Sequence, residues 1–192
     1  YLMGKILGLD LSENNGNLSV DDFRAMKDAG VSFLILRTGY QETEDSLFRT
    51  YYQNAVEAGI TNIGAYHYSY AKDPAAAKVE GQVCAKIISD AGVGLSLPVF
   101  YDCEENRLHG QATECTAAFI EGLGGLNAGV YASYSWFAAG EIDYEKLGIP
   151  IWNAEYNVED DIKGFMWQFT DNAQIPGIEN KGFDADYLYT ED

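Results

Sequence analysis

Two carboxylates, Asp102 and Glu104, stand two positions apart in the largely apolar segment 98–104. If this segment is a β-strand, both side chains point to the same face of the sheet, about 6.5 to 7 Å apart along the backbone. Neighbouring carboxylates repel one another's charge, so one pKa rises and one group keeps its proton near neutral pH. Glycoside hydrolysis needs such a pair, an acid for the leaving oxygen and a negative group for the oxocarbenium-like centre. On its own, Asp-x-Glu on a strand is also common in salt bridges, caps and metal sites.

The rest of the chain alternates short apolar runs with longer stretches that carry helix signals. Ser19, followed three positions later by Asp22, predicts the start of a helix that Gly30 ends. Gly59 closes a second helix, and Pro74 suits the first turn of a third. The pattern predicts helices at about 19–30, 45–58, 73–91 and 111–123, with a weaker helical stretch around 135–147. It predicts strands at 5–11, 33–39, 62–69, 98–104, 128–133, 150–156, 165–170 and 183–188.

Eight strands are therefore expected, and only the first five are followed by helices. Alternating β and α units favour a parallel sheet, and eight strands is the number at which such a sheet closes around a filled interior. We expect an α/β fold, a single modified TIM-type barrel without its last three helices. No internal repeat, low-complexity run or linker interrupts the chain, so one domain over residues 1–192 is expected.

A parallel barrel gathers the C-terminal ends of its strands at one mouth, which is where the active site of such folds lies. Acids and aromatics dominate these ends, and no glycine-rich phosphate loop occurs at a strand-to-helix turn. Sugar rings stack on aromatic side chains, and their hydroxyls bond to carboxylates and amides, so the mouth suits a carbohydrate. The residues at the strand ends are, in order, Asp10, Arg37, Tyr66, His67, Tyr68, Asp102, Glu104, Tyr131, Trp152, Glu155, Trp167, Gln168, Asp184 and Asp186.

Composition and charge exclude several classes of protein. The chain has 30 acidic residues against 12 Lys plus Arg, which gives a net charge of −18. Such a field repels nucleic acid and anionic membrane surfaces, so neither is an expected partner. No apolar run approaches the roughly 20 residues that cross a bilayer. The start, 1–8, lacks the features of a signal peptide, which predicts synthesis in the cytoplasm.

Cysteine and histidine residues add little reactive chemistry. The three cysteines are an odd number without metal-type spacing, so we expect no disulfide framework. Strand alternation turns Cys103 away from its acidic neighbours, which predicts a small core residue. By the same alternation His67 points toward the helices, and a buried, hydrogen-bonded role is expected. His109 is the only other histidine, so no zinc site, metal or cofactor is expected.

Seven segments carry a resemblance to a known family through their order and spacing. They are 8–12 (GLDLS), 33–40 (FLILRTGY), 64–68 (GAYHY), 101–104 (YDCE), 129–133 (GVYAS), 151–154 (IWNA) and 166–169 (MWQF). The chain resembles, over essentially its whole length, the glycoside hydrolase family 25 muramidases. These are the Chalaropsis-type lysozymes common among phage endolysins and bacterial autolysins. The resemblance implies a (β/α)5β3 barrel.

The resemblance also implies hydrolysis of the β-1,4 bond between N-acetylmuramic acid and N-acetylglucosamine in peptidoglycan. Glu104 takes the position of the general acid. Asp102 takes that of a second carboxylate, which acts on the substrate's 2-acetamido group or the forming cation. Either this carboxylate or the acetamido group attacks the anomeric carbon. Asp186 stands where the family commonly has Asn. The residues expected to bind substrate are Asp10, Asp184, Arg37, Tyr66, Tyr68, Tyr131, Trp152 and Gln168, of which Arg37 could instead pair with an acid.

Two other functions fit the same residues, a carbohydrate-binding barrel without catalysis and a glycosidase for chitin-like polymers. The expected partner is the peptidoglycan glycan strand. A surface with a net charge of −18 should adhere poorly to teichoic-acid-rich walls, so we expect a separate wall-binding module after Asp192. The expected setting is that of a phage endolysin that acts on the bacterial cell wall.

Overall fold

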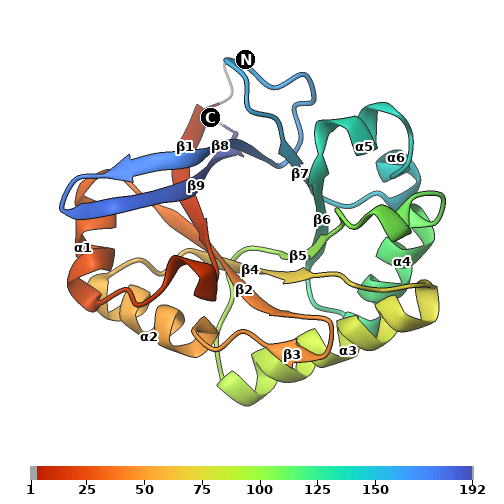
Figure 1. The fold of residues 1–192 in the computed structure, drawn as a ribbon, viewed down its shortest axis with the longest axis horizontal. Coiled ribbons are helices and arrows are strands. Elements are labelled where there is room, and N and C mark those ends of the chain that lie inside the picture. Colours follow the sequence, from red (N-terminus) through yellow and green to blue (C-terminus); the bar gives the residue numbers. More distant parts are fainter. Residues whose placement is uncertain (1–3, 192) are drawn as a thin grey trace.

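The computed structural model describes residues 4–191, and eight of its strands form a closed ring (Figure 1). Pairing between the first two strands closes the ring, and a short ninth strand, β3 (Thr43–Glu44), pairs with β2 alone. The expected modified TIM-type barrel is therefore confirmed. The strands of the ring are β1 (Gly4–Leu11), β2 (Phe33–Tyr40), β4 (Ile63–Tyr68), β5 (Val99–Asp102), β6 (Ala128–Ser133), β7 (Ile151–Ala154), β8 (Met166–Ile175) and β9 (Ile178–Thr190).

Helices follow the strands of the first five β–α units and lie outside the ring (Figure 1). Ser19 caps the first helix in a reciprocal capping box with Asp22, as the sequence predicts. Asp73 caps the third, with Pro74 in its first turn, and Gly59 closes the second in the left-handed conformation at φ 92°. The helices are α1 (Val20–Asp28), α2 (Phe48–Ala58), α3 (Pro74–Ala91), α4 (Ala112–Leu123), α5 (Tyr134–Ala138) and α6 (Tyr144–Leu147), with two 3-10 turns, η1 (Glu13–Asn15) and η2 (Asn106–Leu108).

The barrel interior is filled by aromatic side chains that lie opposite glycines. Phe33 pairs with Gly8, and Phe100 with Gly129. A Cβ at Gly8 would lie 2.4 Å from the Phe33 ring, and one at Gly129 would lie 2.6 Å from the Phe100 ring. The absent side chains leave room for the rings, which is how so small a barrel encloses them. A larger apolar layer between strands and helices completes the core and includes Cys103, whose predicted burial is confirmed.

The last strand runs opposite to the expected direction. β9 is antiparallel to both of its neighbours, β8 and β1, whereas an all-parallel ring was expected. Pro176 and Gly177 form a two-residue connection, with Gly177 at φ 93°, that reverses the chain directly after β8. Without a crossover helix, a strand can return only antiparallel. The two strands extend beyond the ring as a hairpin that lies over α1 (Figure 1).

The strand that carries the two carboxylates is shorter than predicted. The expected strand over 98–104 ends at Asp102, because its neighbour β4 ends at the paired residue Tyr68. Glu104 therefore lies in the segment that follows β5. Among residues 4–191, no helix combines the length and apolar character that a membrane crossing requires. The expected domain covers residues 1–192. Residues 1–3 and 192 lie outside the part that the structure describes, and so does the start of segment 1–8, which was expected not to be a signal peptide.

Candidate active site

A cavity of about 280 Å³ opens at the end of the barrel where the parallel strands finish. Its lining contains all ten residues predicted to form the site, so residues from all eight strands of the ring and the segment after β5 meet in one place. Three further lining residues were not predicted, because they follow β1 in a turn that has no strand pattern. The lining consists of Asp10, Ser12, Asn14, Asn15, Arg37, Tyr66, Tyr68, Asp102, Glu104, Tyr131, Trp152, Gln168 and Asp184.

Asp102 and Glu104 differ in their exposure to solvent. Asp102 is 4% exposed at the end of β5, whereas Glu104 is exposed at the cavity rim. Burial raises the pKa of the Asp102 carboxyl well above its ordinary value, and the charge and hydrogen bond of Glu104 raise it further. Asp102 Oδ1 has no hydrogen-bond partner within residues 4–191. The pair thus places a buried carboxyl with a raised pKa beside an exposed one.

A second group of acids comes from β1 and β9. Asp10 lies opposite Asp184 in the antiparallel ladder, so the reversed direction of β9 brings its first half to the mouth. Burial, followed by the charge of Asp184, raises the pKa of Asp10 to about 8. Asp184 lines the cavity, whereas Asp186 is fully buried and lies outside the lining. The structure thereby settles which of the two β9 aspartates faces the cavity.

Asp186 is held in the barrel interior by a tryptophan. Trp152 Nε1 donates a hydrogen bond of 2.8 Å to Asp186 Oδ1. Asp186 Oδ2 has no such partner among the described residues. Burial and the nearby charge of Asp10 raise the pKa of Asp186 well above its ordinary value, which favours the protonated form of this carboxyl. A neutral carboxylic acid offers one donor and one acceptor, as the amide of the commoner Asn does.

Comparison with known families decides what kind of protein this is. The family described as Glycosyl hydrolases family 25 matches residues 9–178. The chain belongs to glycosyl hydrolases family 25. The resemblance carried by the seven sequence segments is thereby confirmed. No curated protein sequence matched the chain in a separate comparison.

Solved structures with the same fold include autolysins, endolysins and lysozymes. The modular autolysin LytC from Streptococcus pneumoniae is 21% identical with a TM-score of 0.80, over 97% of this chain and 47% of LytC. The CTP1L endolysin is 26% identical with a TM-score of 0.81, over 97% of this chain and 67% of the endolysin. The bacterial lysozyme from Streptomyces coelicolor is 21% identical with a TM-score of 0.72, over 95% of this chain and 91% of the lysozyme. The family 25 chain thus spans less than half of LytC.

Gln168 connects the acids of this family 25 chain to its aromatic wall. Its Nε2 donates to Asp10 Oδ2 at 2.8 Å, and its Oε1 accepts from the hydroxyls of Tyr131 and Tyr156, each at 2.8 Å. Tyr131 also lies edge-on to Trp152, with ring centroids 4.5 Å apart. Three side chains of the cavity wall are therefore fixed by hydrogen bonds and ring contacts before any substrate arrives.

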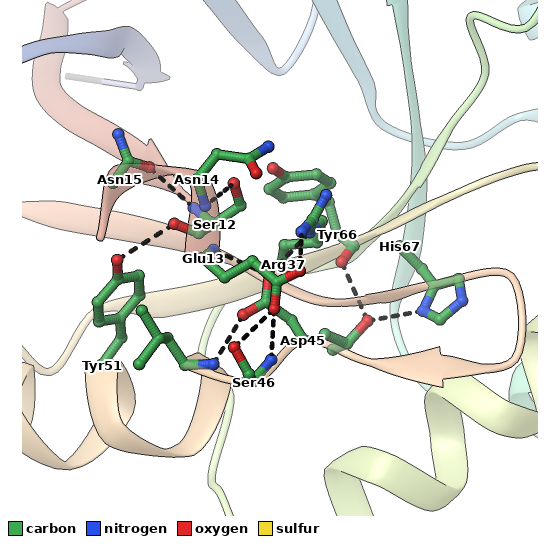
Figure 2. Close-up of polar contacts among 12 residues, drawn as sticks. Ser12, Glu13, Asn14, Asn15, Arg37, Asp45, Ser46, Tyr51, Tyr66 and His67 are labelled. Atoms are coloured by element: carbon green, nitrogen blue, oxygen red, sulfur yellow. Dashed lines mark hydrogen bonds and ion pairs between the residues drawn. The ribbon is translucent and has the colours of Figure 1, made fainter. Parts of the chain in front are cut away.

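Arg37 pairs with two acids at the edge of the cavity (Figure 2). Its Nε donates to Asp45 Oδ2 at 2.8 Å, and a terminal nitrogen lies 3.3 Å from Glu13 Oε1. Ser46 donates to Glu13 Oε2 from both its backbone nitrogen and its hydroxyl, at 2.8 and 2.7 Å. The guanidinium is thus anchored by the segments that follow β1 and β2. Of the two roles considered for Arg37, the structure shows the pairing with acids.

His67 lies on the opposite side of β4 from the cavity and is fully buried. Its Nε2–H donates to the carbonyl of Gln41 at 2.8 Å. Its Nδ1 lies 2.9 Å from Thr38 Oγ1 (Figure 2). Burial lowers the pKa of His67 to about 4, so the ring is neutral near pH 7. The predicted buried, hydrogen-bonded role is confirmed.

Two further residues at the strand ends, Trp167 and Glu155, do not reach the cavity. Trp167 alternates with the inward-facing residues of β8 and packs outside the barrel against Tyr187, with ring centroids 5.7 Å apart. Its Nε1 donates to the carbonyl of Glu155 at 2.7 Å. The Glu155 carboxylate accepts from Asn153 and from the backbone of Asp161 instead of facing the cavity. Within residues 4–191, no group of three or more His, Cys, Asp or Glu side chains could hold a metal ion.

Proposed function

We propose that this chain is a muramidase that cleaves the β-1,4 bond between N-acetylmuramic acid and N-acetylglucosamine in peptidoglycan. The observation that carries the proposal is the pair of Asp102 and Glu104 at one acidic, aromatic cavity. Membership of family 25 supports it, and so does the fold shared with an S. coelicolor lysozyme. The cavity offers carboxylates and amides for sugar hydroxyls, and aromatic rings for sugar faces.

Glu104 delivers the proton in this mechanism, because it is the exposed member of the pair. The two carboxyls share one proton, which burial places on Asp102 in the free enzyme. As that proton passes to Glu104 and on to the leaving oxygen, the bond from the anomeric carbon to this oxygen breaks. Asp102 is then an anion beside the forming oxocarbenium-like centre. Either Asp102 or the substrate's acetamido group attacks that centre, and water completes the hydrolysis.

The other lining residues bind substrate in this proposal. Asp10 and Asp184 accept hydrogen bonds from sugar hydroxyls at the β1–β9 side. The aromatic residues provide stacking surfaces, and the amide of Gln168 orients Asp10. Arg37 supplies a positive charge near the pair, held in place by its two acidic partners. The residues proposed to bind substrate are Asp10, Arg37, Tyr66, Tyr68, Tyr131, Trp152, Gln168 and Asp184.

Replacement of Glu104 by Gln tests the assignment of the acid. We expect Glu104→Gln to lower the release of reducing sugar from purified peptidoglycan by at least about a thousandfold, because the amide cannot donate the proton. Asp102→Asn should lower it by roughly a hundredfold, since charge stabilisation is lost. Glu114→Gln makes the same change at an exposed position on α4 and should be without effect. Retained activity in Glu104→Gln, with an unchanged melting temperature, would refute this role.

A carbohydrate-binding barrel without catalysis and a chitin-specific glycosidase remain the competing functions. The two carboxyls at the cavity, one of them with a pKa raised by burial, favour catalysis over binding alone. Unmodified protein that binds cell walls without turnover would favour the binding barrel. A parallel digest of chitin oligomers and cell walls separates the two glycosidases, and we expect cleavage of the walls only.

We propose that the natural protein acts on the bacterial cell wall as an endolysin and carries a further wall-binding module. LytC, described as modular, is about twice as long as the part this chain matches. A net charge of −18 disfavours adhesion of this barrel to anionic wall polymers. The 192-residue chain should therefore sediment weakly with purified walls. Tight co-sedimentation of this chain alone would contradict the need for such a module.

A further inference from the structure

A second cavity, of about 460 Å³, lies beside the catalytic one. We call it the side pocket. The segment after β2, the segment between β4 and α3, one face of α3 and η2 form its walls. None of its lining residues belongs to the lining of the catalytic cavity. The polar residues and the aromatic residue of the side pocket are Gln41, Glu42, Tyr70, Lys72, Glu80 and Arg107.

The side pocket contains two cations that make no ion pair within residues 4–191, Lys72 and Arg107. Six of the twelve Lys and Arg residues make no ion pair among the described residues, and two of these six line this one pocket. Gln111 holds the two backbones together, because its Nε2 donates to the carbonyls of both Lys72 and Arg107, at 3.0 and 2.8 Å. The two cationic segments are thus tied to one another at a fixed place.

The acids of the side pocket compensate this positive charge only in part. Glu80 is 2% exposed and accepts from Ser69 Oγ at 2.9 Å and from the Tyr70 backbone at 3.1 Å. Glu80 therefore fixes the position of the segment that carries Tyr70. Burial raises the pKa of Glu80 to about 7. Glu42 is the one exposed acid of the lining. In 0.15 M salt, charges act over about 8 Å, so an anion in the pocket responds to these cations more than to the distant acids.

A pair of tyrosines connects the side pocket to the catalytic cavity. Tyr68 lines the catalytic cavity, and its ring lies 4.9 Å from that of Tyr70 in the side pocket. The Tyr68 hydroxyl donates to Glu105 Oε1 at 2.7 Å, between Glu104 and the η2 turn that carries Arg107. A chain leaving a sugar bound near Glu104 would cross this pair of rings. Two extended residues span about 7 Å, enough to pass such a contact.

We propose that the side pocket binds the stem peptide that muramic acid carries, with Lys72 and Arg107 holding its carboxylates. The inference rests on the proposed muramidase function and names the part of the substrate recognised outside the glycan cavity. A stem peptide branches from the sugar, carries free carboxylates and has short apolar side chains. Arg and Lys suit those carboxylates, and Tyr70 and the exposed Val79 suit the apolar groups. An uncharged chitin-like glycan has no group that requires these cations.

The test compares two soluble substrates, glycan strands with their stem peptides and the same strands after an amidase has removed the peptides. In the double variant Lys72→Gln, Arg107→Gln, we expect KM for peptide-bearing strands to rise about tenfold, as two charge-assisted hydrogen bonds are lost. Turnover of peptide-free strands should change less than twofold. The matched control is Lys27→Gln, Lys146→Gln, which removes the same charge at two exposed residues outside both cavities.

Each result decides the inference. A selective rise in KM for peptide-bearing strands, absent from the control variant, supports it. Equal losses on both substrates would overturn it, because the cations would then act on the fold or the glycan. An unchanged KM on both would overturn it as well. Wild-type protein that cleaves neither substrate would overturn the proposed activity together with this inference, whereas wild-type cleavage with unselective variants overturns the inference alone.

Discussion

Gln168 Nε2 donates a hydrogen bond of 2.8 Å to Asp10 Oδ2 and so joins two residues that lie 158 positions apart in the chain. The contact passes over β9, which lies between β1 and β8 in the ring. Because the same amide accepts from two tyrosines through its oxygen, its orientation is fixed. The position of Asp10 at the catalytic cavity therefore depends on closure of the barrel by its last strands.

Replacement of Gln168 by Leu should lower activity by about tenfold to a hundredfold, since buried hydrogen bonds of about 1–2 kcal/mol each are lost at the cavity wall. Reducing-sugar release, normalised to folded protein, measures the effect. Gln174→Leu is the matched control, because Gln174 lies on the same strand with its side chain exposed. Equal activity in both variants would show that the amide does not organise the site.

Replacement of His67 by Phe should weaken the fold and spare the chemistry. The variant loses the hydrogen bonds of the ring with the Gln41 carbonyl and with the Thr38 hydroxyl. We therefore expect a loss of about 2 kcal/mol in the free energy of unfolding. Urea denaturation measures this loss, while activity at 25 °C should stay within about threefold, since the ring does not touch the cavity. A large loss of activity at unchanged stability would instead assign His67 a role in the reaction.

Stability should fall as the pH rises from 6.5 to 8. The pKa of Asp10 is raised to about 8 from 3.8, so the folded protein holds this proton more tightly than the unfolded chain does. Its contribution is full below about pH 4 and is lost as the pH rises through about 8. Glu80, raised to about 7, acts with the same sign. Neutral His67, with its pKa lowered to about 4, acts oppositely but only below pH 6.5.

The melting temperature, measured by calorimetry at pH 6.5 and pH 8, reports the sum of these contributions to stability. Between pH 6.5 and pH 8, one such group lowers the free energy of unfolding by about 2 kcal/mol. This loss lowers the melting temperature by roughly 4–8 °C. Asp186→Asn should reduce the decline, because it removes one buried carboxyl beside Asp10 while an amide can still accept from Trp152. A melting temperature that rises toward pH 8 would contradict the assignment of neutral, buried acids.

The packing of α3 on α4 depends on a glycine at their contact. A Cβ at Gly81 would lie 2.1 Å from the Phe119 carbonyl oxygen, so Gly81→Ala forces the helices apart. We expect a loss of about 1–3 kcal/mol in stability, although alanine favours helices in general. At Gly94 the nearest atom to a new Cβ is 3.8 Å away, and Gly94→Ala should be tolerated. Equal melting temperatures for both variants would show that the contact is not tight.

The sequence contains enough to predict the barrel and the ten cavity residues, because strand ends in a parallel barrel converge on one mouth. Alternation within a strand also separates inward from outward residues, as at His67. Alternation alone could not show whether Trp167 points into the barrel, because the inward face of β8 becomes clear only from its pairing with β7. The direction of β9 depends on the Pro176–Gly177 turn, and the position of Ser12 depends on a cap. The register of β2 against β4 shifts between Arg37 and Gly39, and the apolar pattern of the sequence does not indicate this shift.

The identity of the cleaved bond distinguishes a muramidase from every other peptidoglycan hydrolase. Mass spectrometry of the soluble muropeptides released from purified peptidoglycan identifies the sugar at each new reducing end. We expect N-acetylmuramic acid at these ends with the wild-type protein, and no release with Glu104→Gln. Reducing ends on N-acetylglucosamine, or free stem peptides from an uncut glycan, would contradict it.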